Sequence, residues 1–559
     1  MLRSGRWATT RLALLTAALL IIVGCSDGET TQTTEAPTDD APSTTTGDEA
    51  TDTTAGQPDD DEASGEGIVI AVAAEPNDLN PGMVGHNEVN TPGMRNVFEP
   101  LIQRNSETGE LLPGLATDWR QVDPLTWEFD LREGVVFHDG EAFNAEAAEL
   151  ALNWMHDPDL PESERGQIAS VYGGPQLTAE ATDEYTLTVT TEEEDPILPS
   201  RMFFFMMFSP AGFDDSSQLV DNPVGTGPYE FVEWERGSHI ELQAFDDWWG
   251  HDSDDALGSV QFESATFLFR DEAPVRMAMT EAGEADIAVN LTSEDCSALN
   301  SAGHRCMSVG SSETVYNQMD AYHEESMLTD QRVRGAVAHA IDSDSILEAI
   351  FGGEVVPASQ MVGSHVIGYA PDLEPYPYDP DRSRTLLEEY QADGGELEPI
   401  SWWYQQDRFP RVSEYVQAAA AMLEEVGFEV EVAGQEAGVA QSEAWPPDFP
   451  PNRIRTHTHG NNIGDLSQTA RIYFREPPGN GDIGCWCQDQ ELFDMVVDGE
   501  ALVGEERAEH WQDVARHVYD EYLYHYGGYL AFNYGLSDRV EWNPQADHYY
   551  LLIQMSPVN

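Results

Sequence analysis

Two histidines and two cysteines in the second half of the chain have the types and spacing of soft-metal ligands. His457 and His459 are two residues apart in a strand-like segment, so their side chains lie on one face. Cys485 and Cys487 flank one tryptophan, and the four side chains together are a set that zinc can bind. The spacing fits no compact zinc module, and an oxidising compartment favours disulfide bonds. We therefore predict no metal site and interpret His459 as a residue at the rim of a pocket.

The cysteine count indicates how the thiols are used. Four cysteines remain besides Cys25, and an even number in an exported chain suggests disulfides. Pairing of Cys296 with Cys306 closes a short loop between a helix and a strand. Cys485 and Cys487 leave three alternatives, which are a strained bridge, two free thiols or a soft-metal pair.

Residues that several enzyme classes require are missing from the chain. All 26 basic residues are arginines, so the chain can form no Walker A loop, lysine Schiff base or protein-kinase site. It has no Gly-x-Ser-x-Gly motif, and the pair His323-Glu324 lacks the second histidine of a zinc protease. We predict that the protein is not an enzyme and needs no cofactor. A secreted hydrolase with paired carboxylates stays as an alternative.

The charge of the chain excludes another class of function. There are 103 acidic residues against 26 basic ones, and the net charge is -77. Such a chain repels phosphate backbones, so we predict no nucleic-acid partner. The acids are spread widely, which favours a solvated acidic surface over an acidic site for a cationic ligand.

The N-terminus has the pattern of an export signal. Arg3, Arg6 and Arg11 precede an apolar run at 12–23, which is shorter than the roughly 20 residues that span a bilayer. Ile22-Val-Gly-Cys25 resembles a bacterial lipobox, in which the cysteine takes the lipid. We predict a signal peptide at 1–24, lipidation of Cys25, and a disordered acidic, Thr-rich tether at 25–67.

Two motifs in the first half of the chain indicate a family. Pro223-Val-Gly-Thr-Gly-Pro-Tyr229 is a turn that feeds an aromatic strand, and Phe245-Asp-Asp-Trp-Trp-Gly250 follows it. The alternation at 126–132 predicts a half-buried strand, and Asn144 is expected to cap a helix that begins near Ala145. This series resembles the extracytoplasmic solute-binding proteins of family 5.

Further segments extend the resemblance over about 68–555. They are Gly283-Glu-Ala-Asp-Ile287, Asp330-Gln-Arg-Val-Arg334, Tyr378-Asp-Pro380 and Ala421-Met-Leu-Glu-Glu-Val-Gly427. The resemblance implies an α/β protein with the two-lobe periplasmic-binding-protein type II fold, cluster C-like, with an extra subdomain inserted in the first lobe. Lobe I is expected at 68–311 with the inserted subdomain at about 111–222, lobe II at 312–528, and a return to lobe I at 529–559.

The resemblance also implies a function without chemistry on the solute. We expect a monomeric, membrane-anchored lipoprotein outside the cytoplasm that closes two lobes over a small peptide-like or amphipathic molecule. It would pass this ligand to the permease of an ABC importer. A metal or metal-chelate binder, as in the nickel branch of the family, is the alternative.

The ligand-binding candidates come from loops and strand ends. In peptide-binding members a loop similar to 459–465 carries an aspartate for the ligand's amine. The matching residue here is Asn461, and Ala437 stands where dipeptide binders carry an aromatic, so both depart from that pattern. The candidate ligand contacts are His459, Asn461, Asn462, Asp465, Trp402, Tyr404, Gln435 and Asn87.

Overall fold

The computed structural model describes residues 67–76, 78–84, 93–105, 108–161, 165, 168–172, 174–212, 220–406, 408–436, 449–477 and 484–558. The predicted signal peptide, the lipidation of Cys25, most of the predicted tether, Asn87 and Ala437 lie outside these residues. Within them, no helix combines the length and apolar composition needed to cross a bilayer.

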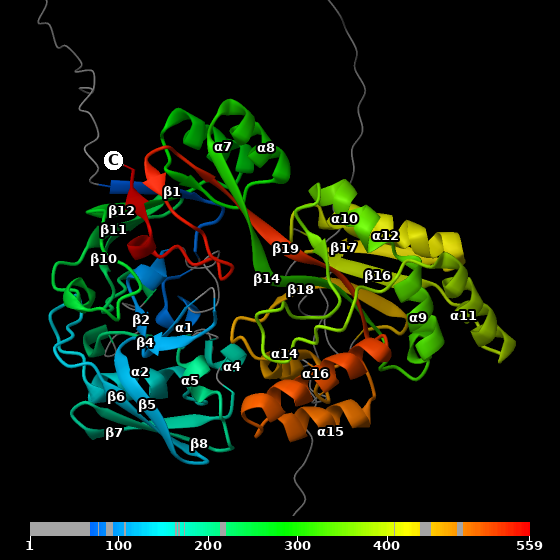
Figure 1. Cartoon of the computed structure of the whole chain (residues 1–559), viewed down its shortest axis with the longest axis horizontal. Coiled ribbons are helices and arrows are strands. Elements are labelled where there is room, and N and C mark those ends of the chain that lie inside the picture. Colours follow the sequence, from blue (N-terminus) through cyan, green and yellow to red (C-terminus); the bar gives the residue numbers. More distant parts are fainter. Residues whose placement is uncertain are drawn as a thin grey trace, which may run out of the picture. The chain divides into compact units, whose positions relative to one another are not determined.

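Two long antiparallel strands connect the two halves of the described structure (Figure 1). They are β14 (Arg305–Met319) and β19 (Tyr524–Leu536), paired from Arg305↔Leu536 to Gln318↔Tyr524. The pairing register shifts between Gly310 and Thr314, which is a bulge. Val309 and Phe532 pack on one hydrophobic core, whereas Val315 and Leu530 belong to another. The bulge therefore lies where the two strands pass from one lobe to the other.

The first core defines lobe I. It draws mainly on residues from 68 to 289 and from 534 to 555. Its part of the main sheet consists of β1 (Gly67–Val72), β10 (Tyr229–Glu235), β11 (His239–Ala244), β12 (Ser264–Phe269) and β13 (Ile287–Ala288), beside helices α7 (Ala273–Ala282) and α8 (Ser293–Ala302). Strand β1 is buried, and it pairs in parallel with β12 and β13, as expected for its apolar sequence. Among the described strands, the main sheet has the order β10-β11-β12-β1-β13-β19-β14-β18-β16-β17.

A separate antiparallel sheet, in the order β5-β6-β8-β7, lies within the lobe I sequence. Its strands are β5 (Ala116–Asp123), β6 (Thr126–Leu131), β7 (Leu177–Asp183) and β8 (Thr186–Thr191), and it lies with α2 (Ala145–Met155). Strand β6 coincides with the alternating segment expected at 126–132. Asn144 caps α2 by accepting a hydrogen bond from the Ala147 backbone at 3.0 Å, so that prediction is confirmed. The remaining elements of this lobe are α1 (Pro81–Val84), β2 (Glu99–Pro100), β3 (Ile102–Arg104), β4 (Leu111–Pro113), α4 (Ile168–Tyr172), α5 (Leu198–Arg201), β9 (Met206–Met207), β20 (Val540–Glu541) and β21 (Ser556–Pro557).

Lobe II has two large hydrophobic clusters, built from residues between Val315 and Leu530. Its strands are β15 (Val356–Pro357), β16 (Ile400–Gln405), β17 (Val430–Gln435) and β18 (Arg453–Gly460). Its helices are α9 (Gln331–Ala340), α10 (Ser343–Phe351), α11 (Pro380–Ala392), α12 (Val412–Val426), α14 (Leu466–Tyr473), α15 (Gln490–Gly499) and α16 (Gly504–Asp520). Asp330 and Asp379, from two of the motifs, cap α9 and α11 through their side chains.

One buried carboxylate joins the two motifs of lobe I. Glu99 accepts hydrogen bonds from Thr226 Oγ1 (2.9 Å), Trp248 Nε1 (3.2 Å) and Trp249 Nε1 (2.9 Å). Burial raises the pKa of Glu99 to about 7, and the three hydrogen bonds act in the opposite direction. The turn at 223–229 and the Trp-Trp pair thus share one polar anchor inside the core.

The four described cysteines form two disulfide bonds, Cys296–Cys306 and Cys485–Cys487. The first joins α8 to β14. In the second, the intervening Trp486 is buried and stacks on Phe449, with ring centroids 4.2 Å apart. The close pair thereby holds an aromatic contact in lobe II.

Candidate functional site

Residues of both lobes meet at the loop that follows β18. Asn462 Nδ2 donates to the Tyr172 hydroxyl at 3.2 Å, and the Asn462 carbonyl accepts a hydrogen bond from Arg104 Nη1. Ser312, in the bulge of β14, donates to Asn462 Oδ1 at 2.9 Å. Tyr172 and Arg104 belong to lobe I, so this predicted site residue contacts the opposite lobe beside the crossing strands.

On the lobe I side, two arginines and two aromatic rings form an arginine–aromatic cluster, defined as Arg95, Arg104, Phe203 and Tyr549. The guanidinium carbon of Arg95 lies 4.1 Å from the Phe203 ring centroid and 3.9 Å from that of Tyr549. The guanidinium carbon of Arg104 lies 4.4 Å from the same Phe203 ring. Stacking on aromatic faces is favourable for arginine, and it holds both cations at the lobe I side of the contact with Asn462.

Asp547 is the acid that influences this cluster. Burial raises its pKa, while the charges of Arg104 and Arg95 act in the opposite direction. Burial also lowers the pKa of Arg104, and Arg95 contributes in the same sense because like charges repel. The local balance is therefore two guanidinium groups against one carboxylate whose ionisation is disfavoured by burial.

On the lobe II side, Asp465 is held by another arginine. Its oxygens accept hydrogen bonds from Arg507 Nε (2.7 Å) and Nη2 (2.8 Å), and it also caps α14 through the Ser467 backbone. Both Asp465 and Arg507 are buried. The carboxylate is thus committed to a two-point ion pair and a helix cap.

His459 and Asn461 are joined to each other through Thr469. His459 Nε2 lies 2.8 Å from Thr469 Oγ1, and Asn461 Nδ2 donates to the same oxygen at 2.9 Å and to the Asp465 carbonyl at 2.9 Å. Burial lowers the pKa of His459 to about 3, and the Arg408 charge acts in the same direction. The imidazole is therefore neutral and lies inside lobe II rather than at a rim.

Three other predicted contacts are on the strands of lobe II. Trp402 is fully buried in β16, where its indole N–H donates to Thr456 Oγ1 at 2.8 Å. Tyr404 is buried and donates to Ser413 Oγ at 2.9 Å, and Gln435 ends β17. None of the three takes part in the contacts between Asn462 and lobe I.

The residues that sequence reasoning missed are those of the arginine–aromatic cluster and Tyr172. Arg95 and Arg104 are close in sequence, but Tyr172 and Phe203 follow well after them and Tyr549 lies near the end of the chain, so no motif contains the set. The consecutive Phe203, Phe204 and Phe205 resemble core packing, and Phe204 indeed stacks on Tyr172 at 4.1 Å. The only signal available in the sequence was the scarcity of basic residues, because Arg95 and Arg104 are two of only 26.

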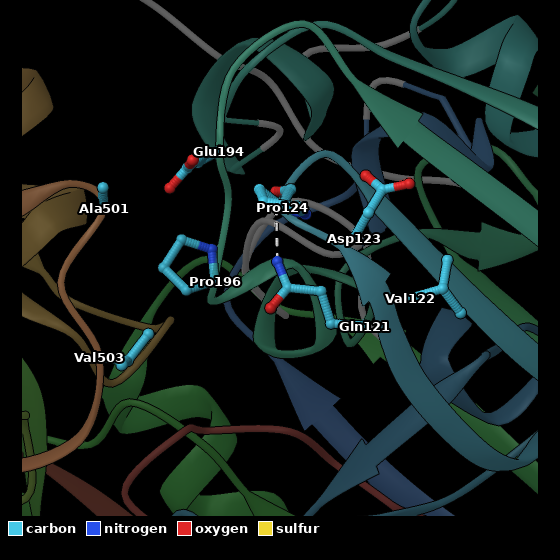
Figure 2. Close-up of a pocket in the computed structure, with 8 residues that line it drawn as sticks. All are labelled: Gln121, Val122, Asp123, Pro124, Glu194, Pro196, Ala501 and Val503. Carbon is cyan, nitrogen blue, oxygen red and sulfur yellow. Dashed lines mark hydrogen bonds between the residues drawn. The ribbon is translucent and has the colours of Figure 1, made fainter.

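A pocket of about 300 Å³ lies elsewhere between the lobes (Figure 2). It is lined by Gln121, Val122, Asp123, Pro124, Glu194 and Pro196 of lobe I, and by Ala501 and Val503 of lobe II. Figure 2 shows the side chain of Gln121 turned toward the Pro124 carbonyl, to which it donates a hydrogen bond at 3.2 Å. The pocket shares no residue with the arginine–aromatic cluster.

Known proteins resemble this chain in sequence and in fold. The family model described as bacterial extracellular solute-binding proteins, family 5 Middle, matches residues 110–450. The dipeptide-binding protein of Escherichia coli is 26% identical over 407 residues, which are 66% of this chain and 72% of that protein. The glutathione-binding protein GsiB of Pectobacterium atrosepticum is 26% identical over 324 residues, 57% of this chain and 60% of that protein.

The fold has close solved counterparts. The ABC transporter substrate-binding protein CtaP of Listeria monocytogenes superposes with a TM-score of 0.74 at 19% sequence identity, covering 89% of this chain and all of CtaP. This likeness confirms the two-lobe fold, and the family model confirms the resemblance carried by the motifs. The chain belongs to family 5 of the bacterial extracellular solute-binding proteins.

Proposed function

We propose that this protein is the substrate-binding lipoprotein of an ABC importer and captures a small organic solute between its lobes. The observation that carries the proposal is the pair of strands β14 and β19, which change from one core to the other at a bulge. Two strand crossings form a hinge, and a ligand bound by both lobes shifts the population toward the closed form. No step of chemistry on the solute is needed.

The contacts of Asn462 support a ligand position between the lobes, beside the loop that follows β18. Asn462 already contacts lobe I through Arg104 and Tyr172, and lobe II through Ser312. A solute at this place touches both lobes at once, which is the condition for coupling binding to closure. The permease then recognises the closed form of the protein.

The domain boundaries and the anchor are part of the proposal. We place lobe I at about 68–311 with its insertion at about 111–222, lobe II at about 312–528, and the return at 529–559. Packing changes between Val309 and Val315 on β14, and between Leu530 and Phe532 on β19, which supports boundaries near these points. Removal of 1–24 and lipidation of Cys25 would attach the protein to the membrane, and 25–67 would act as the tether.

Native mass spectrometry and a thermal-shift screen of the mature protein test the proposal. We expect one small molecule bound per chain and a rise of several degrees in Tm with a ligand that is recovered unchanged. Conversion of the ligand to a product contradicts the proposal. Loss of a bound species on treatment with a chelator favours the metal-chelate alternative instead.

A further inference from the structure

Arg95 is a buried cation with an incomplete set of hydrogen bonds. Only 7% of the residue is exposed, and its Nη2 donates to the Phe203 carbonyl at 3.0 Å. Its Nε is buried and has no acceptor among the described residues. A buried donor without an acceptor costs about 1–3 kcal/mol, and more when the donor is charged. Such a group in a native protein calls for an explanation.

Arg104 is partly buried and lies against the same Phe203 ring. A guanidinium offers five N–H donors, and in the described structure Arg104 uses one of them, toward the carbonyl of Asn462. The acceptor is a neutral backbone oxygen, and it comes from the opposite lobe. Two neighbouring cations therefore share one aromatic ring with most of their donors unused by described groups.

In the described structure, the two nearby acids accept no hydrogen bond from Arg95 or Arg104. The carboxylate of Asp465 accepts hydrogen bonds from Arg507 Nε at 2.7 Å and Nη2 at 2.8 Å. Asp547 influences both arginines through its charge, but its described hydrogen bond comes from the Tyr549 backbone at 3.3 Å. Although the chain has a net charge of -77, Asp547 is the carboxylate whose charge acts on both arginines.

We propose that the ligand of this protein is an organic anion, and that Arg104 and Arg95 bind its carboxylate between the lobes. The inference rests on the proposed function and narrows it to one class of solute. A carboxylate takes two parallel hydrogen bonds from a guanidinium, which satisfies donors that backbone oxygens leave open. The aromatic faces of Phe203 and Tyr549 hold the guanidinium planes in place before the ligand arrives.

When the ligand binds, it replaces or joins a contact that Arg104 already makes in the described structure. The ligand carboxylate replaces the Asn462 carbonyl as acceptor, or joins it through another N–H of the same guanidinium. Asn462 and Tyr172 then offer neutral polar groups to the rest of the molecule. Asp465, the acid within this loop, is committed to Arg507 and is not available to a cationic group on the ligand.

Matched acid and amide pairs test the inference. The probes are benzoate and benzamide, hippurate and its amide, N-acetylphenylalanine and its amide, and Phe-Gly and its amide, with inorganic phosphate and sulfate as further arms. We expect thermal shifts from organic acids and none from the paired amides. A shift from phosphate or sulfate alone would mean that the site takes inorganic anions, which overturns the organic-anion assignment. Any molecule released from the denatured protein is identified by mass spectrometry, and a neutral or cationic one also overturns it.

Arg104→Gln and a control variant test whether Arg104 binds the carboxylate of the ligand. Arg104→Gln keeps a donor but removes the charge, and we expect the affinity for the binding acids to fall at least about tenfold. Arg132→Gln is the control, because Arg132 also lies over a ring, 4.1 Å from Trp249, but outside the cluster. Equal affinity of Arg104→Gln and the unaltered protein contradicts the inference while leaving the proposed function intact. Absence of binding by every probe, amides and peptides included, together with no carried ligand, contradicts the proposed function itself.

Discussion

Arg507 of lobe II and Arg104 of lobe I both bond to the loop that follows β18, but they differ in how many of their donors are used. Arg507 makes five described hydrogen bonds, two to Asp465 and three to the carbonyls of Gly499, Glu500 and Leu502. Arg104 makes one within the described part of the chain, to Asn462. The first arrangement leaves nothing for a ligand, and the second leaves most of a guanidinium available. The difference separates an arginine that supports the fold from one that suits binding.

The largest effect is expected from breaking the satisfied pair. Arg507→Met leaves Asp465 buried beside an apolar side chain, and we expect a loss of about 3–5 kcal/mol in the free energy of unfolding. Urea unfolding measures it. Arg516→Met is the control, since its pair with Asp372 is exposed and should contribute about 1 kcal/mol or less. Similar losses in both variants would remove the contrast on which the comparison depends.

A satisfied acid offers the next test. Glu99 has its pKa raised to about 7 by burial, against 4.5 in the unfolded chain. A raised acid pKa favours the folded state when the group is protonated, so this contribution is present below pH 4.5 and is lost as the pH rises through 7. The full loss is about 3 kcal/mol. The unfolding free energy between pH 4.5 and 8 should fall less steeply in Glu99→Gln, and identical slopes would contradict the prediction.

A half-exposed pair gives a smaller effect. The hydrogen bond from His517 to Asp489, at 2.7 Å, raises the pKa of His517 in the last turn of α16. Its stabilisation is present below pH 6.5 and is lost as the pH rises through the folded value. We expect about 1 kcal/mol or less, measured as the difference in Tm between pH 6 and 9. His517→Gln should lose that difference, and a variant that keeps it would exclude His517 as the source.

The smallest effect on folding is expected at Arg104. Burial lowers the pKa of this guanidinium, and one hydrogen bond compensates little of the desolvation. Arg104→Gln should therefore change the free energy of unfolding without ligand by about 1 kcal/mol at most, in either direction. Urea unfolding in ligand-free buffer measures it. A loss as large as that of Arg507→Met would make Arg104 a structural residue.

Some of the fold could be read from local patterns. The strand at 126–132, the Asn144 cap and the capped helices at 331–340 and 380–392 depend on side chains within a few residues of one another. The motif turn at 223–229 was also recognised from the sequence. The buried group that stabilises the turn was not. That group is Glu99, more than a hundred residues earlier, which accepts from both motifs.

The site was less accessible to sequence reasoning. Asn462 and Asp465 were picked from a loop, and the structure gives them different tasks, one between the lobes and one in an ion pair with Arg507. Trp402 was picked for its aromatic run, yet burial in β16 encloses it. The sequence cannot distinguish an aromatic or amide side chain in a core from one in a cleft, because burial is not a local property of the sequence.

By itself, the sequence indicated the family, and it predicted the helices and strands whose caps and alternation are local. The tertiary structure alone decided which arginines keep donors that no described group accepts. Arg95, Arg104, Phe203 and Tyr549 come together only when lobe I folds and the end of the chain returns to it with Tyr549. The physical reason is that hydrogen-bond satisfaction depends on neighbours in space, and for these residues those neighbours are distant in the chain.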